Sequence, residues 1–122
     1  MLAVDRNNAR VADLYQEFHP AVLHALRDVV NAAHAENKPL GICGEMAGNP
    51  AAAILLTAMG FDVLSMNSNN LLMVKWAIRS FSLVQAKKIL SNVLKMDNAY
   101  LIKNYVEEEL RKAGLGQLIR TH

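Results

Sequence analysis

Residues 40–66, LGICGEMAGNPAAAILLTAMGFDVLSM, decide the fold of this chain. Leu40 to Cys43 is a short apolar run that predicts a buried strand. Pro50 suits the first position of a helix and Gly60 suits its end, so a helix is predicted between them. Phe61 to Met66 predicts a second strand. Strand, helix and strand in this order indicate a βαβ unit with parallel strands and a right-handed crossover.

Further helices are predicted on both sides of this unit. His19-Pro20 opens the first, in which apolar residues recur at helical spacing through about Glu36. After the second strand, the polar run 67–70 and Asp97 offer N-caps. The helices that follow are predicted over 71–79, 83–94 and 99–112. The predicted fold is therefore helix-rich α/β, in one domain over residues 1–122.

The two predicted strands and the helix between them are largely apolar on all sides. Both predicted strands are apolar on both sides, which is typical of a sheet covered on both faces or of a barrel wall. The helix over 51–59 has no polar residue except Thr57, so it also requires cover on more than one side. Two strands alone, however, do not make a stable parallel sheet.

Composition excludes several classes of protein. The 122 residues are 52% hydrophobic with a formal net charge of +2, which argues against disorder and against a multidomain enzyme in this chain. No apolar run reaches the roughly 18 residues of a membrane span. The single cysteine fits a reducing, cytoplasmic compartment. The net charge is too weak to predict nucleic-acid or membrane partners, and Lys75 with Arg79 and Lys87-Lys88 are too sparse for a nucleic-acid patch.

The loop after the first strand is the best candidate for chemistry. Residues 41–50 hold two glycines after Cys43, at the strand end where α/β folds collect ligands and catalytic groups. A thiol there can act as a nucleophile or as a proton donor. The alternative is a buried structural cysteine, the commonest fate of a lone cysteine.

Residues 43–48, Cys-Gly-Glu-Met-Ala-Gly, resemble the Cys-Gly-Glu-apolar-Ala-Gly signature of the phosphoenolpyruvate-utilising enzymes, above all enzyme I of the bacterial phosphotransferase system. Residues 2–8 resemble the loop after the sixth barrel strand of that family. Residues 14–23 resemble the segment leading into the next helix, and 59–66 resemble the last strand. The resemblance covers nearly the whole chain, and residues 74–76 favour the nitrogen-related paralogue.

The resemblance implies a fold and an activity. The chain is expected to be the C-terminal portion of a (β/α)8 TIM barrel, formed by its last two strands and the surrounding helices. The family uses magnesium to transfer the phosphoryl group of phosphoenolpyruvate to a histidine on a separate domain, and releases pyruvate. A phosphocarrier protein is the expected partner through that N-terminal domain. The relay serves sugar transport or nitrogen regulation.

The resemblance also assigns site residues. Cys43 takes the role of the acid and base at the methylene carbon of the pyruvate enolate, and Arg6 contacts the substrate phosphate. Gly44 and Glu45 shape the loop. The roles make physical sense, because an enolate needs a positioned acid and a guanidinium stabilises phosphoryl oxygens. No motif here matches the family's magnesium carboxylates, other substrate arginines or phosphorylated histidine, so the chain alone is expected to be inactive.

Two positions depart from the family pattern. Asn49 stands where an aspartate is common, and Leu72 stands where a proline is common. Neither belongs to the family's chemical groups.

Other polar and aromatic residues are predicted to be structural. His19, His24 and His34 are expected on helix surfaces, because none has a ligand partner one helical turn away. The pairs Glu107–Arg111 and Glu108–Lys112 are expected to form ion pairs on a solvated helix. Trp76 and Phe81 are expected to pack between helices, and an exposed Trp76 would indicate a partner surface.

Two rival functions stay open. The family's barrel is also its dimerisation domain, and a half-barrel must cover its open strand edges, so the chain is a candidate dimerisation or assembly module that forms a homo-oligomer. The second rival is an unrelated α/β protein in which Cys43 is structural.

Overall fold

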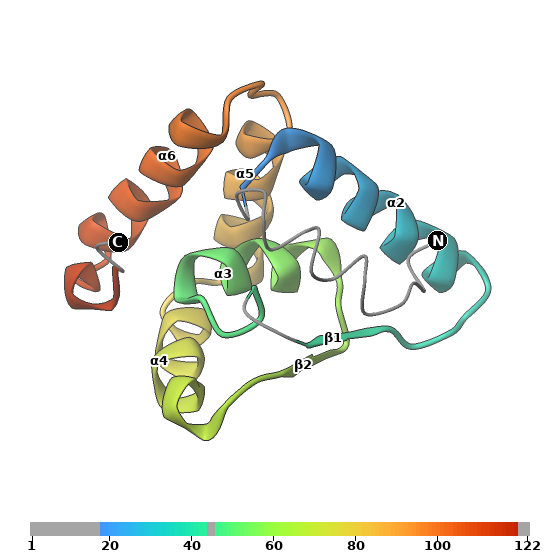
Figure 1. Cartoon of the computed structure of the whole chain (residues 1–122), viewed down its shortest axis with the longest axis horizontal. Helices are drawn as coiled ribbons and strands as arrows, with labels where there is room; N and C mark the ends of the chain where they lie inside the picture. Colours follow the sequence, from blue (N-terminus) through green and yellow to red (C-terminus); the bar gives the residue numbers. More distant parts are fainter. Residues whose placement is uncertain (1–17, 44–45, 120–122) are drawn as a thin grey trace.

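The structure, a computed structural model, describes residues 18–43 and 46–119 (Figure 1). The helices and strands are α2 Pro20–Ala35, β1 Gly41–Cys43, α3 Pro50–Met59, β2 Val63–Ser65, α4 Ser68–Arg79, α5 Leu83–Val93, α6 Ala99–Lys112 and the 3₁₀ turn η1 Gly116–Leu118. This order confirms the predicted helix-rich α/β chain with a strand–helix–strand unit at its centre.

The two strands form a small parallel sheet. Gly41 pairs with Val63, Ile42 with Leu64 and Cys43 with Ser65. Both strands are shorter than predicted. One reason lies at Leu40, whose backbone N–H donates to the carboxylate of Asp62 at 2.7 Å instead of joining a strand ladder. Two parallel strands are confirmed. A closed barrel needs more strands than the described residues contain.

The core is built around α3. All of its residues are buried except Thr57, which is half-buried. Helices α4, α5 and α6 pack against it, and Figure 1 shows α4 and α5 beside it. Leu23 and Val30 of α2 belong to the same core. The prediction that α3 is covered on more than one side is confirmed, and the cover comes from helices of this chain.

The sheet, by contrast, is less covered than predicted. Val63 is 56% exposed, Ser65 is exposed and Leu64 is half-buried. The expectation of burial on both faces is therefore wrong for this chain by itself. The physical reason is that the helices after β2 fold onto α3, which leaves the short sheet at the margin of the core (Figure 1).

The start of one helix and the capping residue of another differ from the predictions. Helix α4 begins at Ser68, three residues before the predicted start, because the polar run 67–70 enters the helix instead of preceding it. Helix α6 is capped by Asn98 and not by Asp97. The Asn98 side chain accepts from the backbone N–H of Tyr100 and Leu101, and asparagine caps a helix as well as aspartate does.

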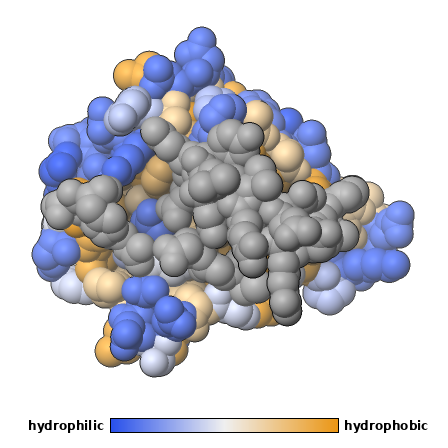
Figure 2. Space-filling view, viewed as in Figure 1, coloured by the Kyte–Doolittle hydropathy of each residue, from blue (hydrophilic) through white to orange (hydrophobic). Residues whose placement is uncertain are grey.

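Trp76 does not pack between helices as predicted. Val74 and Ala77 are the buried residues of α4, and 100° per residue puts Trp76 on the opposite side of the helix. Its exposed fraction is 47%. Phe81, in the turn after α4, is half-buried against the core as expected. Figure 2 shows apolar residues among hydrophilic ones on the visible surface.

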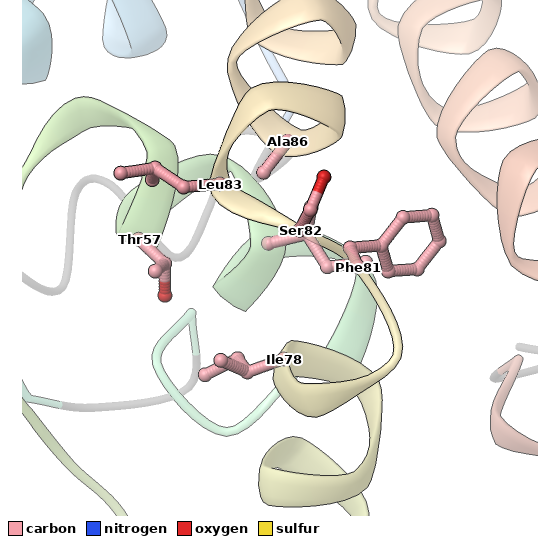
Figure 3. A pocket seen from close by; sticks show the side chains of 7 residues that line it. Thr57, Ile78, Phe81, Ser82, Leu83 and Ala86 are labelled. Atoms are coloured by element: carbon pink, nitrogen blue, oxygen red, sulfur yellow. The ribbon is translucent and has the colours of Figure 1, made fainter.

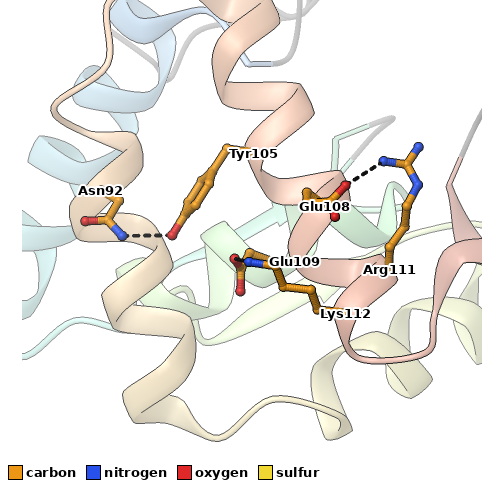
Figure 4. Close-up of polar contacts among 6 residues, drawn as sticks. All are labelled: Asn92, Tyr105, Glu108, Glu109, Arg111 and Lys112. Carbon is orange, nitrogen blue, oxygen red and sulfur yellow. Dashed lines mark hydrogen bonds and ion pairs between the residues drawn. The ribbon is translucent and has the colours of Figure 1, made fainter.

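Side-chain hydrogen bonds join the helices at their ends. His24 Nε2 of α2 donates to the carbonyl of Leu94, just after α5, at 2.9 Å. Asn92 of α5 donates to the Tyr105 hydroxyl of α6 at 2.8 Å (Figure 4). No helix in the described part of the chain is long and apolar enough to cross a membrane.

The ion pairs on α6 have a different spacing from the predicted one. Glu108 pairs with Arg111 at 3.2 Å and Glu109 pairs with Lys112 at 3.3 Å, both three residues apart instead of four (Figure 4). Both spacings bring side chains together on a helix surface, so the prediction of a solvated, paired face is right in kind and wrong in its partners.

Candidate functional site at the end of β1

The candidate site lies at the carboxyl end of the parallel sheet. The backbone of Cys43 is the last position of β1 and pairs with Ser65, the last position of β2. The sequence prediction that Cys43 ends a strand is therefore confirmed. Arg6, Gly44 and Glu45 lie outside the described residues, so their predicted roles stay predictions, as does the role of the Cys43 thiol.

The loop after Cys43 is anchored from Met46 onward, where the described residues resume. The backbone N–H of Asn49 donates to the carbonyl of Met46 at 3.2 Å, which closes a turn. Ala47 is fully buried, and Gly48 is buried beside it. Buried anchors of this kind hold a loop in one position, so the end of the Cys43 loop is tied to the core.

Gly48 allows a close approach between this loop and α4. A Cβ atom at Gly48 would lie 2.8 Å from Nδ2 of Asn70, which is closer than real Cβ contacts. Only glycine fits here without moving the Asn70 side chain. The loop from β1 and the first turn of the helix after β2 are thus packed together, and sequence reasoning missed this contact.

Asn49 holds the start of α3. Its side-chain Oδ1 accepts from the backbone N–H of Ala51 at 3.0 Å, and Pro50 follows as the first helical residue. Aspartate forms the same cap, since both side chains offer an oxygen to the first helical N–H groups. The departure from the family's aspartate at this position therefore preserves the structural role.

A polar clip holds the opposite end of the two strands. Asp62, just before β2, accepts from the backbone N–H of Leu40 at 2.7 Å and from His34 Nε2 of α2 at 3.3 Å. The Leu40 hydrogen bond, followed by the one from His34, holds the pKa of the Asp62 carboxyl below its ordinary value. The clip sets the register of the strands at their amino ends, away from Cys43.

The histidines have structural partners, as expected. His19 caps α2 through Nδ1, His24 binds the end of α5, and His34 belongs to the Asp62 clip. Residues 18–43 and 46–119 bring no group of three or more His, Cys, Asp or Glu side chains together. This part of the chain therefore does not fit a metal centre of its own.

Asn70 and Asp62 are the residues of this region that sequence reasoning did not single out. The polar run 67–70 was interpretable only as a set of helix caps, since a contact with Gly48 depends on tertiary packing. Asp62 lies two residues after Gly60 and just before β2, and nothing in the sequence pairs it with His34.

Comparison with known proteins identifies the family. Residues 1–83 match the family described as PEP-utilising enzyme, PEP-binding domain, where PEP is phosphoenolpyruvate. The chain belongs to this family. The matched residues include the whole strand–helix–strand unit and the Cys43 loop.

Several curated relatives match over most of this chain. An Escherichia coli K12 protein named phosphoenolpyruvate-dependent phosphotransferase system is 36% identical over 120 residues, which are 98% of this chain and 16% of the relative. Phosphoenolpyruvate-protein phosphotransferases of Haemophilus influenzae and Geobacillus stearothermophilus are each 39% identical, over 93% and 87% of this chain. The chain spans about one sixth to one fifth of the length of these relatives.

Proposed function

We propose that this chain is the part of a phosphoenolpyruvate-protein phosphotransferase that protonates the pyruvate enolate and binds the substrate phosphate. The carrying observation is the position of Cys43, whose backbone ends β1 at the carboxyl edge of a parallel sheet. Catalytic groups of parallel α/β folds gather at this edge. The names of the relatives, which include phosphoenolpyruvate-protein phosphotransferase, support the reaction.

The proposed step moves one proton and one phosphoryl group. A protein histidine outside this chain attacks phosphorus, and the bond between phosphorus and the enol oxygen breaks. The electron pair left on that oxygen forms the enolate of pyruvate. The Cys43 thiol gives its proton to the methylene carbon, pyruvate leaves, and water returns a proton to the thiolate. Arg6 holds the phosphate through charge-assisted hydrogen bonds.

The loop anchors support this assignment physically. A proton donor must be held within hydrogen-bond reach of the carbon it protonates. The buried Ala47, the close packing of Gly48 on Asn70 and the Asn49 cap fix the far end of the loop that carries Gly44 and Glu45. The loop is therefore held on both sides of this segment, by the pairing of Cys43 with Ser65 before it and by the anchors from Met46 onward after it.

The barrel, the magnesium ion and the remaining partners belong to the same proposal. The two parallel strands with helices are those expected of the end of a (β/α)8 barrel. Magnesium supplies charge stabilisation in such phosphoryl transfers, and its ligands would come from outside the described residues, which do not fit a metal site. Histidine phosphorylation and the phosphocarrier protein likewise belong to the longer parent enzyme.

Two finer assignments complete the proposal. Residues 74–76 support the nitrogen-related branch over the sugar-transport branch. The single cysteine supports a cytoplasmic parent enzyme, because a free catalytic thiol persists in a reducing compartment.

The decisive experiment replaces Cys43 by alanine in the full-length parent enzyme. Pyruvate release should fall by about 10²- to 10⁴-fold, the usual contribution of a positioned acid. The matched control is Ser65→Ala, since Ser65 is the register partner of Cys43 and has no role in the proposed step. Undiminished phosphotransfer in Cys43→Ala would mean that the cysteine is structural.

A second experiment tests the chain of 122 residues by itself. With magnesium and excess phosphoenolpyruvate it should release no pyruvate, because the proposed phosphoryl acceptor and metal ligands come from elsewhere in the parent. Turnover without added protein would contradict the proposal.

A self-associating module is the second candidate, favoured by the exposed sheet. In the described residues each strand has one neighbour only, and Val63 is 56% exposed. Unpaired strand edges promote pairing with another chain. We therefore propose that the isolated chain forms homo-oligomers through the sheet. Light scattering of the chain at micromolar concentration tests this, and a monomer would refute it.

A further inference from the structure

The two chain segments that leave the sheet meet again beyond it. Cys43 at the end of β1 is the register partner of Ser65 at the end of β2. Five residues after each of them, Gly48 and Asn70 are in contact. The loop after Cys43 is therefore joined to the β2–α4 segment twice, once by strand pairing and once by this contact.

The contact at Gly48 is made by the side chain of Asn70. The three heavy atoms nearest to a Cβ built on Gly48 are Nδ2, Cγ and Cβ of Asn70, at 2.8, 3.4 and 3.5 Å. Gly48 is buried and Asn70 is half-buried, so the amide lies against the loop. Asn70 itself is held in the first turn of α4, where its backbone N–H donates to the carbonyl of Asn67 at 3.0 Å. The position of the loop is thus tied to the start of α4.

Another attachment of the loop belongs to α3. Asn49 caps this helix by accepting from the backbone N–H of Ala51, and Pro50 is the first helical residue. This cap fixes the loop to the helix that follows it in the chain. The contact with Asn70 fixes the loop to the helix that follows the other strand. It is the second attachment that ties the loop to the β2 side of the sheet.

Helix α4 packs closely at this end and less closely at the other. Ile78 lies eight residues after Asn70, about 12 Å further along the helix. It borders an apolar hollow of about 170 Å³ between α3, α4 and α5, with Thr57 and Leu83 across from it (Figure 3). Side chains around a void have fewer contacts. The contact with Gly48 therefore fixes α4 at the end nearer to the candidate site.

We propose that Asn70 is a positioning residue for the proton transfer by Cys43. This inference rests on the proposed function. Asn70 acts through Gly48, by holding the loop so that the Cys43 thiol stays within reach of the methylene carbon of the enolate. A proton donor must lie within hydrogen-bond reach of its acceptor, and an error of about 1 Å in position lowers a rate by about 10²-fold.

Direct contact with the substrate is the alternative role for Asn70. An amide that bound the phosphate in the ground state and the transition state alike would lower KM, so its loss would raise KM at unchanged kcat. The loss of a positioning residue lowers kcat and kcat/KM equally. The geometry favours positioning, because Nδ2 is the atom of Asn70 that lies closest to the Cβ position of Gly48.

The test uses the full-length parent enzyme, with pyruvate release measured over a range of phosphoenolpyruvate concentrations. Asn70→Ala should lower kcat about 10- to 100-fold at unchanged KM. The first control, Asn69→Ala, removes the same atoms from the next residue, which is exposed, and should leave both constants unchanged. The second control, Ile78→Ala, removes packing at the other end of α4 and should also leave kcat unchanged.

A double-mutant cycle with Cys43 separates this role from the proposed function. In a Cys43→Ala background, Asn70→Ala should cause no further loss of kcat, because the group that it positions is gone. Full activity of Cys43→Ala would refute both the proposed function and the role of Asn70. Impaired Cys43→Ala together with full activity of Asn70→Ala would refute the role of Asn70 alone.

Gly48 provides a rescue of the positioning contact. In Asn70→Ala, the further change Gly48→Ala puts a methyl group 3.5 Å from the Cβ atom of residue 70, which restores an ordinary contact. This double variant should recover part of the lost kcat, whereas Gly48→Ala alone should lower kcat. Circular dichroism checks the fold of every variant. If Asn70→Ala does not fold, the kcat of Gly48→Ala decides.

Four results would overturn the proposal. The first is an unchanged kcat in Asn70→Ala, or in Gly48→Ala where that variant decides. The second is a raised KM at unchanged kcat, which would make Asn70 a substrate contact. The third is an equal loss in either control, which would assign the effect to α4 packing in general. The fourth is a loss that multiplies with that of Cys43→Ala, or no recovery in the rescue variant.

Discussion

The contact between Gly48 and Asn70 predicts that Gly48→Ala destabilises the chain when Asn70 is present and is neutral or stabilising when Asn70 is replaced by alanine. Replacing Gly48 by alanine adds a Cβ atom 2.8 Å from Nδ2 and 3.4 Å from Cγ of Asn70. The side chain of Asn70 must move away to make room. Overpacking of this kind costs about 1–3 kcal/mol, so the free energy of unfolding should fall by about that amount in Gly48→Ala.

Gly48→Ala should not lower the free energy of unfolding once the side-chain amide of Asn70 is removed. In an Asn70→Ala background the nearest remaining atom of residue 70 is its Cβ, at 3.5 Å from the new methyl group, which is an ordinary contact. What remains is the loss of backbone freedom in the unfolded chain, which stabilises by about 0.4–1 kcal/mol. Gly48→Ala is therefore expected to be neutral or stabilising in that background.

The assay is a double-mutant cycle. Urea unfolding, followed by Trp76 fluorescence and by circular dichroism, gives the free energy of unfolding of the unmodified chain, both single variants and the double variant. The expected coupling between the two sites is about 2 kcal/mol. If Gly48→Ala costs the same in both backgrounds, the loop does not pack on α4 as the structure has it, and the anchoring of the Cys43 loop is refuted.

Substitutions at three further positions test the surroundings of the loop and of the strands. Asn49→Ala should destabilise the chain by about 1 kcal/mol through loss of the α3 cap, whereas Asn49→Asp keeps the cap oxygen and should stay within a few tenths of a kcal/mol, both by urea unfolding. Gly60→Ala should cost about 1–2 kcal/mol, because Gly60 ends α3 in the left-handed region at φ 108°, and the new Cβ would also lie 2.9 Å from His34 Cε1. Asp62→Asn should lower the melting temperature near pH 6, with a difference that shrinks as the pH falls below the ordinary aspartate pKa of about 3.9. The sign follows from the lowered pKa of Asp62, since its stabilisation is present above the unfolded-state pKa and is lost as the pH falls through the folded-state pKa.

Each of these tests has an internal control. Gly114 also has a positive φ, of 83°, but a Cβ there would meet nothing within 4 Å, so Gly114→Ala measures the backbone cost without a clash. If Gly60→Ala and Gly114→Ala lower the free energy of unfolding equally, the contact of the new Cβ atom with His34 costs nothing. Equal effects of alanine and aspartate at Asn49 would contradict the cap. If the difference in melting temperature between Asp62→Asn and the unmodified chain stays the same down to pH 3, the clip formed by Asp62 with Leu40 and His34 is contradicted.

Local signals in the sequence predicted the elements of this chain well. Proline at a first helical position and glycine at a helix end bound α3 where predicted, since both act through their own backbone geometry. The parallel strand order followed from the alternation of strand and helix, and Cys43 was predicted at a strand end. The Cys-Gly-Glu motif indicated the family that the comparison then identified.

Contacts between distant residues depended on the tertiary structure. The packing of Gly48 on Asn70 and the clip of His34 and Asp62 join residues more than twenty positions apart, and neither has a local pattern. The exposure of Trp76 depends on which side of α4 meets α3, and that is decided by packing over the whole core. By itself the sequence determined the order of helices and strands, the bounds of α3 and which residue types stand at the end of β1, because those properties depend on neighbours along the chain. The fold decided which faces are buried, which loops are anchored and which cations stay without an ion pair in the described residues. The reason is that burial and charge pairing depend on neighbours in space.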